Sequence, residues 1–212
     1  MRTPTHLISA ALCLALGAGL PVVVAGCSTT SAQRLDSTTS TMGDIQSDLD
    51  KGEAQLDTLL ASMQALESGT DTDENYRAFK RAAEHLKSTA DRIRARRVSL
   101  EARAAEHVAR WQSESARLSG ERAQNISEDR REQFENSVGS VSEELDELRA
   151  AYDPFLTKLN DLQVVLANDL TRRGIERTAP LRAGLRDMAE ELRERSESTR
   201  QALREAREDF AR

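Results

Sequence analysis

The residue best able to carry chemistry in this sequence is Cys27, near its beginning. A thiolate is a strong nucleophile, and the small residues Ala25 and Gly26 just before Cys27 leave the backbone open to an approaching enzyme. An apolar run over residues 7–24 precedes this position, and polar residues follow it directly. Such a run at the extreme N-terminus, ending in small residues, is typical of a cleaved signal segment. We therefore expect residues 1–26 to be removed as a signal peptide.

The segment Val24, Ala25, Gly26 and Cys27 resembles the lipobox of bacterial lipoproteins. The resemblance implies that Cys27 carries a diacylglyceryl group with palmitate-type acyl chains, and two or three such chains hold a protein firmly on a membrane. An Asp directly after the acylated cysteine would resemble an inner-membrane retention signal, but this position is Ser28. We therefore expect the protein at the outer membrane of a bacterial cell envelope, facing the periplasm. An uncleaved anchor, or an ordinary secretory signal with an incidental cysteine, is the alternative.

Two histidines follow Cys27, and both fall within one expected helix, far apart along it. A zinc site on a helix needs ligands three or four residues apart, so His85 and His107 predict no metal site and are expected to be solvated or at the edge of a helix interface. The sequence contains no Gly-rich phosphate loop and no G-x-S-x-G motif. We therefore expect no enzymatic activity, no cofactor and no small-molecule substrate.

A dense basic run, Arg92-Ile93-Arg94-Ala95-Arg96-Arg97, is the sharpest local charge feature. The favoured interpretation is a helix face whose arginines pair with acidic neighbouring helices. The alternative is that Arg92, Arg94, Arg96 and Arg97 contact an anionic partner, such as lipid headgroups, lipopolysaccharide or an acidic protein.

Aromatic residues are few, at 3% of the chain, and most fall at expected core positions. We expect them to form wide layers of a helical bundle around a kink at Pro154, with a small-molecule pocket beside the kink as the alternative. The residues concerned are Tyr76, Phe79, Trp111, Tyr152 and Phe155.

The elements that position these residues are expected to be long helices. The chain has 212 residues, of which 31% are charged, with only ten Gly and four Pro, and such a composition argues against sandwiches, barrels and disordered linkers. A net charge of -6 disfavours a dedicated nucleic-acid binder.

Apolar residues recur at alternating steps of three and four from residue 42 to the end of the chain, which predicts coiled-coil-like helices. The second of four series shifts by one residue near Val108. The first and third series are Met42, Ile45, Leu49, Gly52, Leu56, Leu59, Met63 and Leu66, then Phe134, Val138, Val141, Leu145, Leu148, Tyr152, Phe155, Leu159, Leu162 and Leu166.

Turn and capping residues divide this body into four helices. The Ser/Thr-rich stretch 28–41 predicts a flexible tether after the acylated cysteine, so that residues 27–41 precede a bundle domain at 42–212. Gly69 ends the first helix, and Asp71 with Glu74 predicts a capping box for the second. The second helix is expected to run to about Leu118, where Ser119-Gly120 weakens it, and Asn125 or Ser127 is the expected cap of the third.

The later boundaries involve two prolines. The apolar spacing continues through Pro154, so we expect a bend and not an end there. Thr171 is the expected N-cap of the fourth helix, with Leu170 and Ile175 as a hydrophobic staple. Pro180 indicates either a kink or a later start near Thr178.

The net charge of the four segments alternates in sign along the chain: the first and third segments are negative, and the second and fourth are positive. Opposite charges favour adjacency of sequential helices, and short connections favour antiparallel packing. The predicted fold is all-α, an elongated up-down-up-down bundle whose thin core leaves room for dimerisation.

With the lipobox, four helical segments, Asp153-Pro154-Phe155-Leu156 and Asp169-Leu170-Thr171-Arg172 in view, the chain resembles the DUF2959-type family. These are bacterial proteins of unknown function that are generally predicted to be lipoproteins. The resemblance covers about Asp44 to Phe210, while Pro180 departs from the family pattern. It implies a helical lipoprotein and no activity or functional residues.

The sequence as a whole favours a non-enzymatic envelope lipoprotein that acts as a spacer, scaffold or adaptor. Its expected partners are the membrane, through the lipid anchor, and another envelope protein or a second copy of the chain. The alternative is a lipid- or ligand-binding module at the membrane surface that uses the basic run 92–97.

Overall fold

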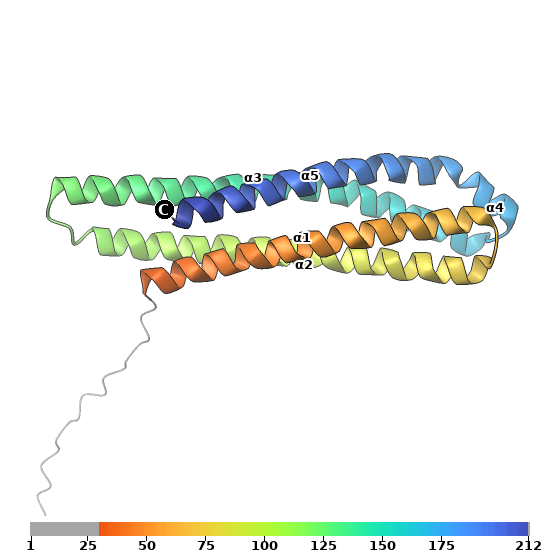
Figure 1. Ribbon diagram of the computed structural model, residues 1–212, viewed down its shortest axis with the longest axis horizontal. Helices are drawn as coiled ribbons and strands as arrows, with labels where there is room; N and C mark the ends of the chain where they lie inside the picture. The colour runs from red at the N-terminus through yellow and green to blue at the C-terminus, as the bar shows by residue number, and fades with distance from the viewer. Residues whose placement is uncertain (1–29, 212) are drawn as a thin grey trace, which may run out of the picture.

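The computed structural model describes residues 30–211, which form an all-helical bundle without strands in that range. Its helices are α1 (Ser31–Ser68), α2 (Thr72–Ser115), α3 (Glu121–Asn168), α4 (Arg172–Arg177) and α5 (Ala179–Ala211). Figure 1 shows an elongated antiparallel arrangement in which the short α4 turns the chain from α3 into α5. The predicted all-α elongated bundle is confirmed.

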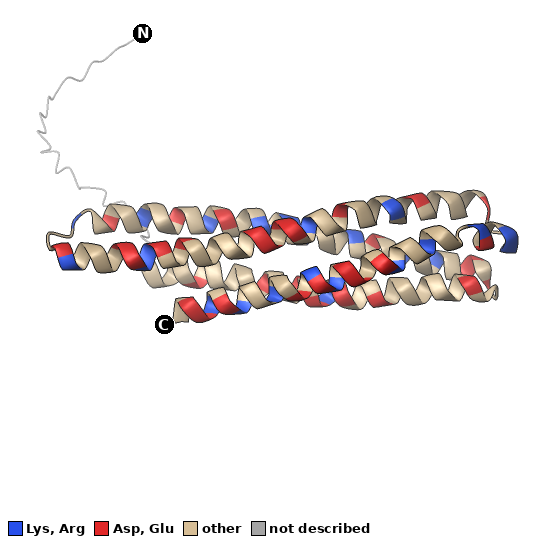
Figure 2. Ribbon diagram, turned by 90° about the horizontal axis from the view of Figure 1, so that it is seen from above, with Lys and Arg blue, Asp and Glu red and all other residues tan. Residues whose placement is uncertain are grey.

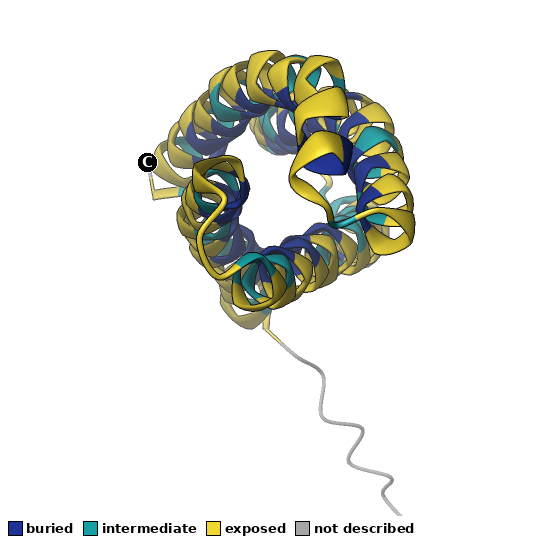
Figure 3. Cartoon of the chain, turned by 90° about the vertical axis from the view of Figure 1, so that its right-hand side faces the viewer, coloured by how far each residue is buried: buried dark blue, intermediate teal, exposed yellow. Residues whose placement is uncertain are grey.

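The four long helices form a closed ring. Seen along the long axis in Figure 3, the buried residues of every long helix face the common centre. The helix α1 packs most extensively against α2, and α3 packs most extensively against α5. Contacts of α2 with α3, and of α1 with α5, close the ring.

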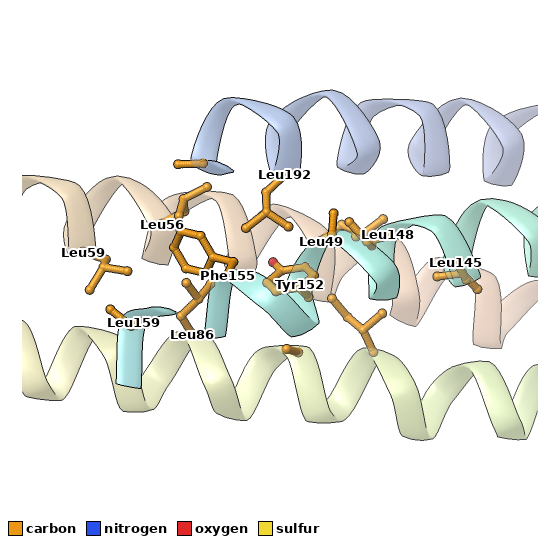
Figure 4. Close-up of a cluster of buried hydrophobic side chains, with 14 of the residues drawn as sticks. Leu49, Leu56, Leu59, Leu86, Leu145, Leu148, Tyr152, Phe155, Leu159 and Leu192 are labelled. Carbon is orange, nitrogen blue, oxygen red and sulfur yellow. The ribbon is translucent and has the colours of Figure 1, made fainter. Parts of the chain in front are cut away.

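The predicted apolar series supply the core. All members of the first and third series are buried, including Leu49, Leu56 and Leu148, which Figure 4 shows grouped around Tyr152 and Phe155. Gly52 has a steric role in this layer, because a Cβ atom there would lie 3.2 Å from the Tyr152 hydroxyl oxygen. The one glycine in the first series therefore makes room for a large residue of α3.

The start of α1 differs from the prediction. Residues 31–41 are helical, so the flexible tether expected over 28–41 is wrong in that range, and the bundle begins well before Met42. Thr30 and Gln33 form a capping box, in which the Thr30 hydroxyl accepts from the Gln33 amide and the Gln33 side chain accepts from the Thr30 amide. The buried residues Thr38 and Thr41 extend the inner face, and their hydroxyls donate to backbone carbonyls one turn earlier.

Two predicted caps are also wrong. Asp71 lies in the left-handed region, with a φ of 44°, and makes no capping bond, so its capping box with Glu74 is absent. The Asn75 side chain holds this turn instead, donating to the Ala65 and Thr70 carbonyls at 3.1 and 2.6 Å. The helix α3 begins at Glu121 after Gly120, and not at a cap formed by Asn125 or Ser127.

The helix α2 ends at Ser115, before the expected end near Leu118, and the remaining boundaries agree with the sequence. Gly69 ends α1 in the left-handed conformation, with a φ of 72°, and α3 continues through Pro154. The Thr171 hydroxyl accepts from the Gly174 amide at 3.2 Å and caps α4. The chain then leaves the helix at Thr178 and starts α5 at Ala179, which is the later start that Pro180 indicated.

A candidate interaction surface around the basic run of α2

The basic run lies at the middle of α2 and is divided between two neighbouring helices. Arg92 and Arg96 face α1, where both reach Asp48, at 3.3 and 2.6 Å. Arg96 also pairs with Asp44 at 2.7 Å. Arg94 and Arg97 are turned toward α3, where they pair with acidic residues. The four arginines therefore do not form one outward-facing patch, and each is engaged within the bundle.

Asp48 is the centre of the α1 side of this network. Asp48 is only 1% exposed, whereas the side chains of its partners Arg92 and Arg96 are each exposed by a third or more. Burial raises the pKa of this carboxyl, but the hydrogen bonds and positive charges of Arg96 and Arg92 outweigh it and hold the pKa below its ordinary value. Asp48 is therefore a buried carboxylate that remains charged. The sequence feature that could have identified Asp48 is its position directly before Leu49 of the apolar series, in an acidic helix that was expected to pair with the basic run.

The α3 side of the run opens into a groove. Arg97 pairs with Asp146 at 2.7 Å, and Arg94 pairs with Asp153, which lies beside Pro154. Between these pairs lies a hollow of about 360 Å³ whose floor is largely apolar. Val98 stands at its edge with 61% of its surface exposed. The groove is lined by Ala90, Ile93, Arg94, Arg97 and Val98 of α2 and by Leu145, Leu148, Arg149, Tyr152 and Asp153 of α3.

Tyr152 forms part of the groove floor but belongs to the core. It is 5% exposed, and burial raises the pKa of its hydroxyl to about 12, with the charge of Arg200 acting in the opposite direction. The phenol therefore stays protonated over the physiological range. The groove thus combines apolar side chains with the guanidinium groups of Arg94, Arg97 and Arg149.

The two histidines have different environments. His85 is exposed, as expected. His107 is 2% exposed, and the expectation that it is solvated or at an interface edge is wrong. The buried series of α2 continues through Leu100, Ala104 and His107, while the expected shift to Val108 leaves that residue only half-buried. The spacing of three between Ala104 and His107 places the imidazole on the inner face.

His107 lies in an aromatic cluster. Its ring centroid is 4.8 Å from that of Phe134 and 5.4 Å from that of Trp111, and Phe134 stacks on Phe210 at 4.9 Å. The predicted aromatic layer around Pro154 is correct for the buried Tyr152 and Phe155. It is wrong for Trp111, which belongs to this separate cluster near the C-terminal end of α2.

Several predicted residues lie outside the part of the chain that the structure describes. They are Val24, Ala25, Gly26 and the lipidation site Cys27, for which the sequence remains the only basis. None of the helices within residues 30–211 combines the length and apolar character needed to cross a bilayer. In the same range, no three His, Cys, Asp or Glu side chains come together in a group that could hold a metal ion.

Comparison of the chain with protein-family models, with curated proteins and with solved structures found no match. The resemblance to the DUF2959-type family therefore stays a prediction from the sequence.

Proposed function

We propose that this protein is a non-enzymatic lipoprotein of the bacterial cell envelope that is tethered through Cys27 and uses its rod-like bundle as a spacer, scaffold or adaptor. The observation that carries the proposal is the position of the lipobox-like segment, which ends three residues before Thr30, the N-cap of α1. A lipid on Cys27 would thus be attached almost directly to one helix of the rod.

The shape of the bundle suits this role. The helix α3 has 48 residues, which corresponds to about 72 Å at 1.5 Å per residue. A rod of this length, held near one end, presents surfaces tens of ångströms from its attachment point. Figure 2 shows acidic and basic residues along the whole rod, and many of them pair between helices. Polar surfaces of this kind suit a spacer or a docking platform for another envelope protein.

The anchor is tested by replacing each cysteine separately. The full chain is expressed in a bacterium that is fed a clickable palmitate analogue, as the wild type, as Cys27→Ser and as Cys13→Ser. Labelling and sedimentation with the outer-membrane fraction are expected for the wild type and for Cys13→Ser, and both are expected to be lost in Cys27→Ser. Labelled Cys27→Ser, or unlabelled wild type, would contradict the proposal.

The adaptor role is tested by in-cell crosslinking with an affinity tag at the C-terminus. A protein that crosslinks to the wild type, and is lost from the crosslinks when Cys27→Ser releases the rod, is the expected result. Crosslinks confined to copies of this chain would instead indicate a self-assembling spacer.

The groove between α2 and α3 supports a second candidate, a binding module for amphipathic anions. Its volume of about 360 Å³ lies within the range of small-molecule pockets, and its arginines border an apolar floor. A fatty acid is a suitable probe, and Val98→Glu, at the exposed edge, would place a negative charge at the entrance. A rise in melting temperature with decanoate that is lost in Val98→Glu would favour this candidate, whereas no shift in the wild type would contradict it.

A further inference from the structure

The helices α2 and α3 continue beyond the four-helix body as a two-helix arm. Figure 1 shows their connection projecting past both the first turn of α1 and the end of α5. Arg96 pairs with Asp44 and Arg103 with Ser37, so Ser31 lies level with about residue 109 of α2. The remaining six residues of α2 project about 9 Å. We call residues 110–132 the arm.

The α3 side of the arm projects further. The hydrogen bond of Ser137 to Asp209, at 3.0 Å, sets the antiparallel register of α3 and α5. By this register, the end of α5 at Ala211 lies level with about residue 135. Because α3 begins at Glu121, more than ten of its residues extend past α5, a length of about 20 Å.

The arm has no core of its own. None of the residues from 108 to 133 is buried. Its two helices are joined at its base by the Trp111 indole, which donates to the Ser127 hydroxyl at 2.9 Å. Ile126 is 57% exposed. Arg110, Arg117 and Arg122 are exposed and form no ion pair with any residue in the range 30–211, unlike the arginines of the basic run.

The start of α1 limits how far the arm can stand from a membrane that holds Cys27. Three residues of extended chain span at most about 11 Å, so a lipid-bearing Cys27 lies within that distance of Thr30. The 14-residue flexible tether expected from the sequence would have allowed a much larger distance between Cys27 and the bundle. The arm projects past α1 by at least about the same length as the span between Cys27 and Thr30. An upright, anchored bundle therefore brings the arm to the headgroup layer.

We propose that the arm docks on the lipid headgroups of the membrane in which Cys27 is anchored, so that the bundle meets the membrane end-on. This inference rests on the lipidation of Cys27 in the proposed function. Residues 110–132 carry equal numbers of basic and acidic side chains, so the arm as a whole is neutral. Its exposed arginines suit the phosphates of lipid headgroups, because the guanidinium binds phosphate while the aliphatic stem lies along apolar groups. The exposed Ile126 suits the boundary between headgroups and acyl chains.

The test uses two tryptophan reporters at opposite ends of α3. The chain has a single tryptophan, so Trp111→Phe provides a background without indole emission. Ile126→Trp places the reporter on the arm, and Val165→Trp places the control at the far end, where Val165 is 42% exposed. Each full-length protein is extracted from bacterial membranes and reconstituted into phosphatidylethanolamine and phosphatidylglycerol vesicles. The vesicles carry either brominated or ordinary acyl chains. Circular dichroism establishes that both variants are helical.

The expected result is a loss of emission on brominated vesicles for the reporter at position 126, with no loss for the reporter at position 165. Equal quenching at both positions would mean that the bundle lies flat and would overturn the end-on arrangement. Absence of quenching at both, in protein that floats with the vesicles, would overturn arm docking and leave the anchor intact. Blue-shifted emission at position 126 without quenching would place a second copy on the arm and also overturn the proposal. Protein that does not float would overturn the anchor and the docking together.

Discussion

At the scale of single residues, Asp48 shows how this bundle uses charge. The carboxylate is buried on α1, and its compensation comes from two arginines of α2 that are themselves partly solvated. A buried charge without partners is costly, whereas one that accepts hydrogen bonds from guanidinium groups is stabilised. The pairing of α1 with the basic run of α2 is therefore specific in position, because an axial shift would separate Asp48 from both arginines.

Asp48→Asn is expected to lower the free energy of unfolding by about 2 kcal/mol, because it weakens two charge-assisted hydrogen bonds in a buried position. Urea unfolding at neutral pH measures this loss. Asp50→Asn is a suitable control, since Asp50 is exposed and its pair with Arg200 is expected to contribute less than about 1 kcal/mol.

The difference between Asp48→Asn and the wild type should also depend on pH. Because the pKa of Asp48 in the folded protein lies below its ordinary value of 3.8, the carboxylate stabilises the fold at pH values above 3.8. This stabilisation is lost as the pH falls through the folded pKa. Equal loss in both aspartate variants, or no change with acid, would contradict the assigned role of Asp48.

His107 predicts a second pH dependence, near neutral pH. Burial lowers the pKa of its imidazole from the ordinary value of 6.5, and the charge of Arg34 acts in the same direction, with Glu114 opposing it. Below pH 6.5 the unfolded chain binds a proton that the folded protein does not, so stability decreases as the pH falls from 6.5 to the folded pKa. His107→Leu should remove this part of the pH dependence of the melting temperature, whereas His85→Gln, at an exposed position, should retain it.

At the scale of the helices, the spacing of apolar residues predicted the inner faces, and polar core residues account for what it missed. The first and third series are buried throughout because each position carries an apolar residue or a glycine. The start of α1 was missed because its inner face continues through Thr38 and Thr41, which resemble linker residues by type. His107 was misplaced for a similar reason, since an imidazole in a core position carries no apolar signal.

The network around the basic run was predictable only in part. Pairing of Arg92 to Arg97 with acidic helices follows from the alternating charges of the segments. The depth of Asp48 and the groove beside Tyr152 depend on the axial register of three helices. That register is determined by packing across the ring, and neither propensity nor periodicity within one helix specifies it.

Gly52 tests this packing between α1 and α3. Alanine gains about 1 kcal/mol over glycine in a helix interior, but overpacking a core costs about 1–3 kcal/mol. A Cβ atom at Gly52 would lie 3.2 Å from the hydroxyl oxygen of the buried Tyr152. We therefore expect Gly52→Ala to lower the free energy of unfolding by about 1 kcal/mol. In Gly139→Ala the new Cβ meets nothing within 4 Å, and this variant should gain stability.

A double variant identifies the contact responsible. Tyr152→Phe removes the hydroxyl oxygen that a Cβ at position 52 would approach, and should make Gly52→Ala neutral or stabilising in that background. If the cost of Gly52→Ala were unchanged without the hydroxyl, the steric explanation would be wrong.

At the scale of the whole molecule, the two ends of the rod are built differently. Salt bridges between side chains join each pair of neighbouring long helices. They are Arg96–Asp44 between α2 and α1, Arg97–Asp146 between α2 and α3, Arg200–Asp50 between α5 and α1, and Arg195–Glu147 between α5 and α3. The apolar core continues along the four-helix body and includes Met63, Leu66 and Phe79 near the turn between α1 and α2. It stops at Phe134, so the arm beyond it contributes no buried residue to the core of the body.

The arm should therefore be removable. Replacing residues 112–128 with a short Gly/Ser linker deletes no buried residue, and should change the free energy of unfolding by no more than about 2 kcal/mol. Replacing the equally long segment 63–79 removes Met63, Leu66 and Phe79, and should cost more than about 5 kcal/mol, since each large buried side chain contributes about 2–5 kcal/mol. Urea unfolding followed by circular dichroism compares the two deletions. Similar losses in both would mean that the arm belongs to the cooperative core, and a stable body without it would leave the arm free for contacts outside the bundle.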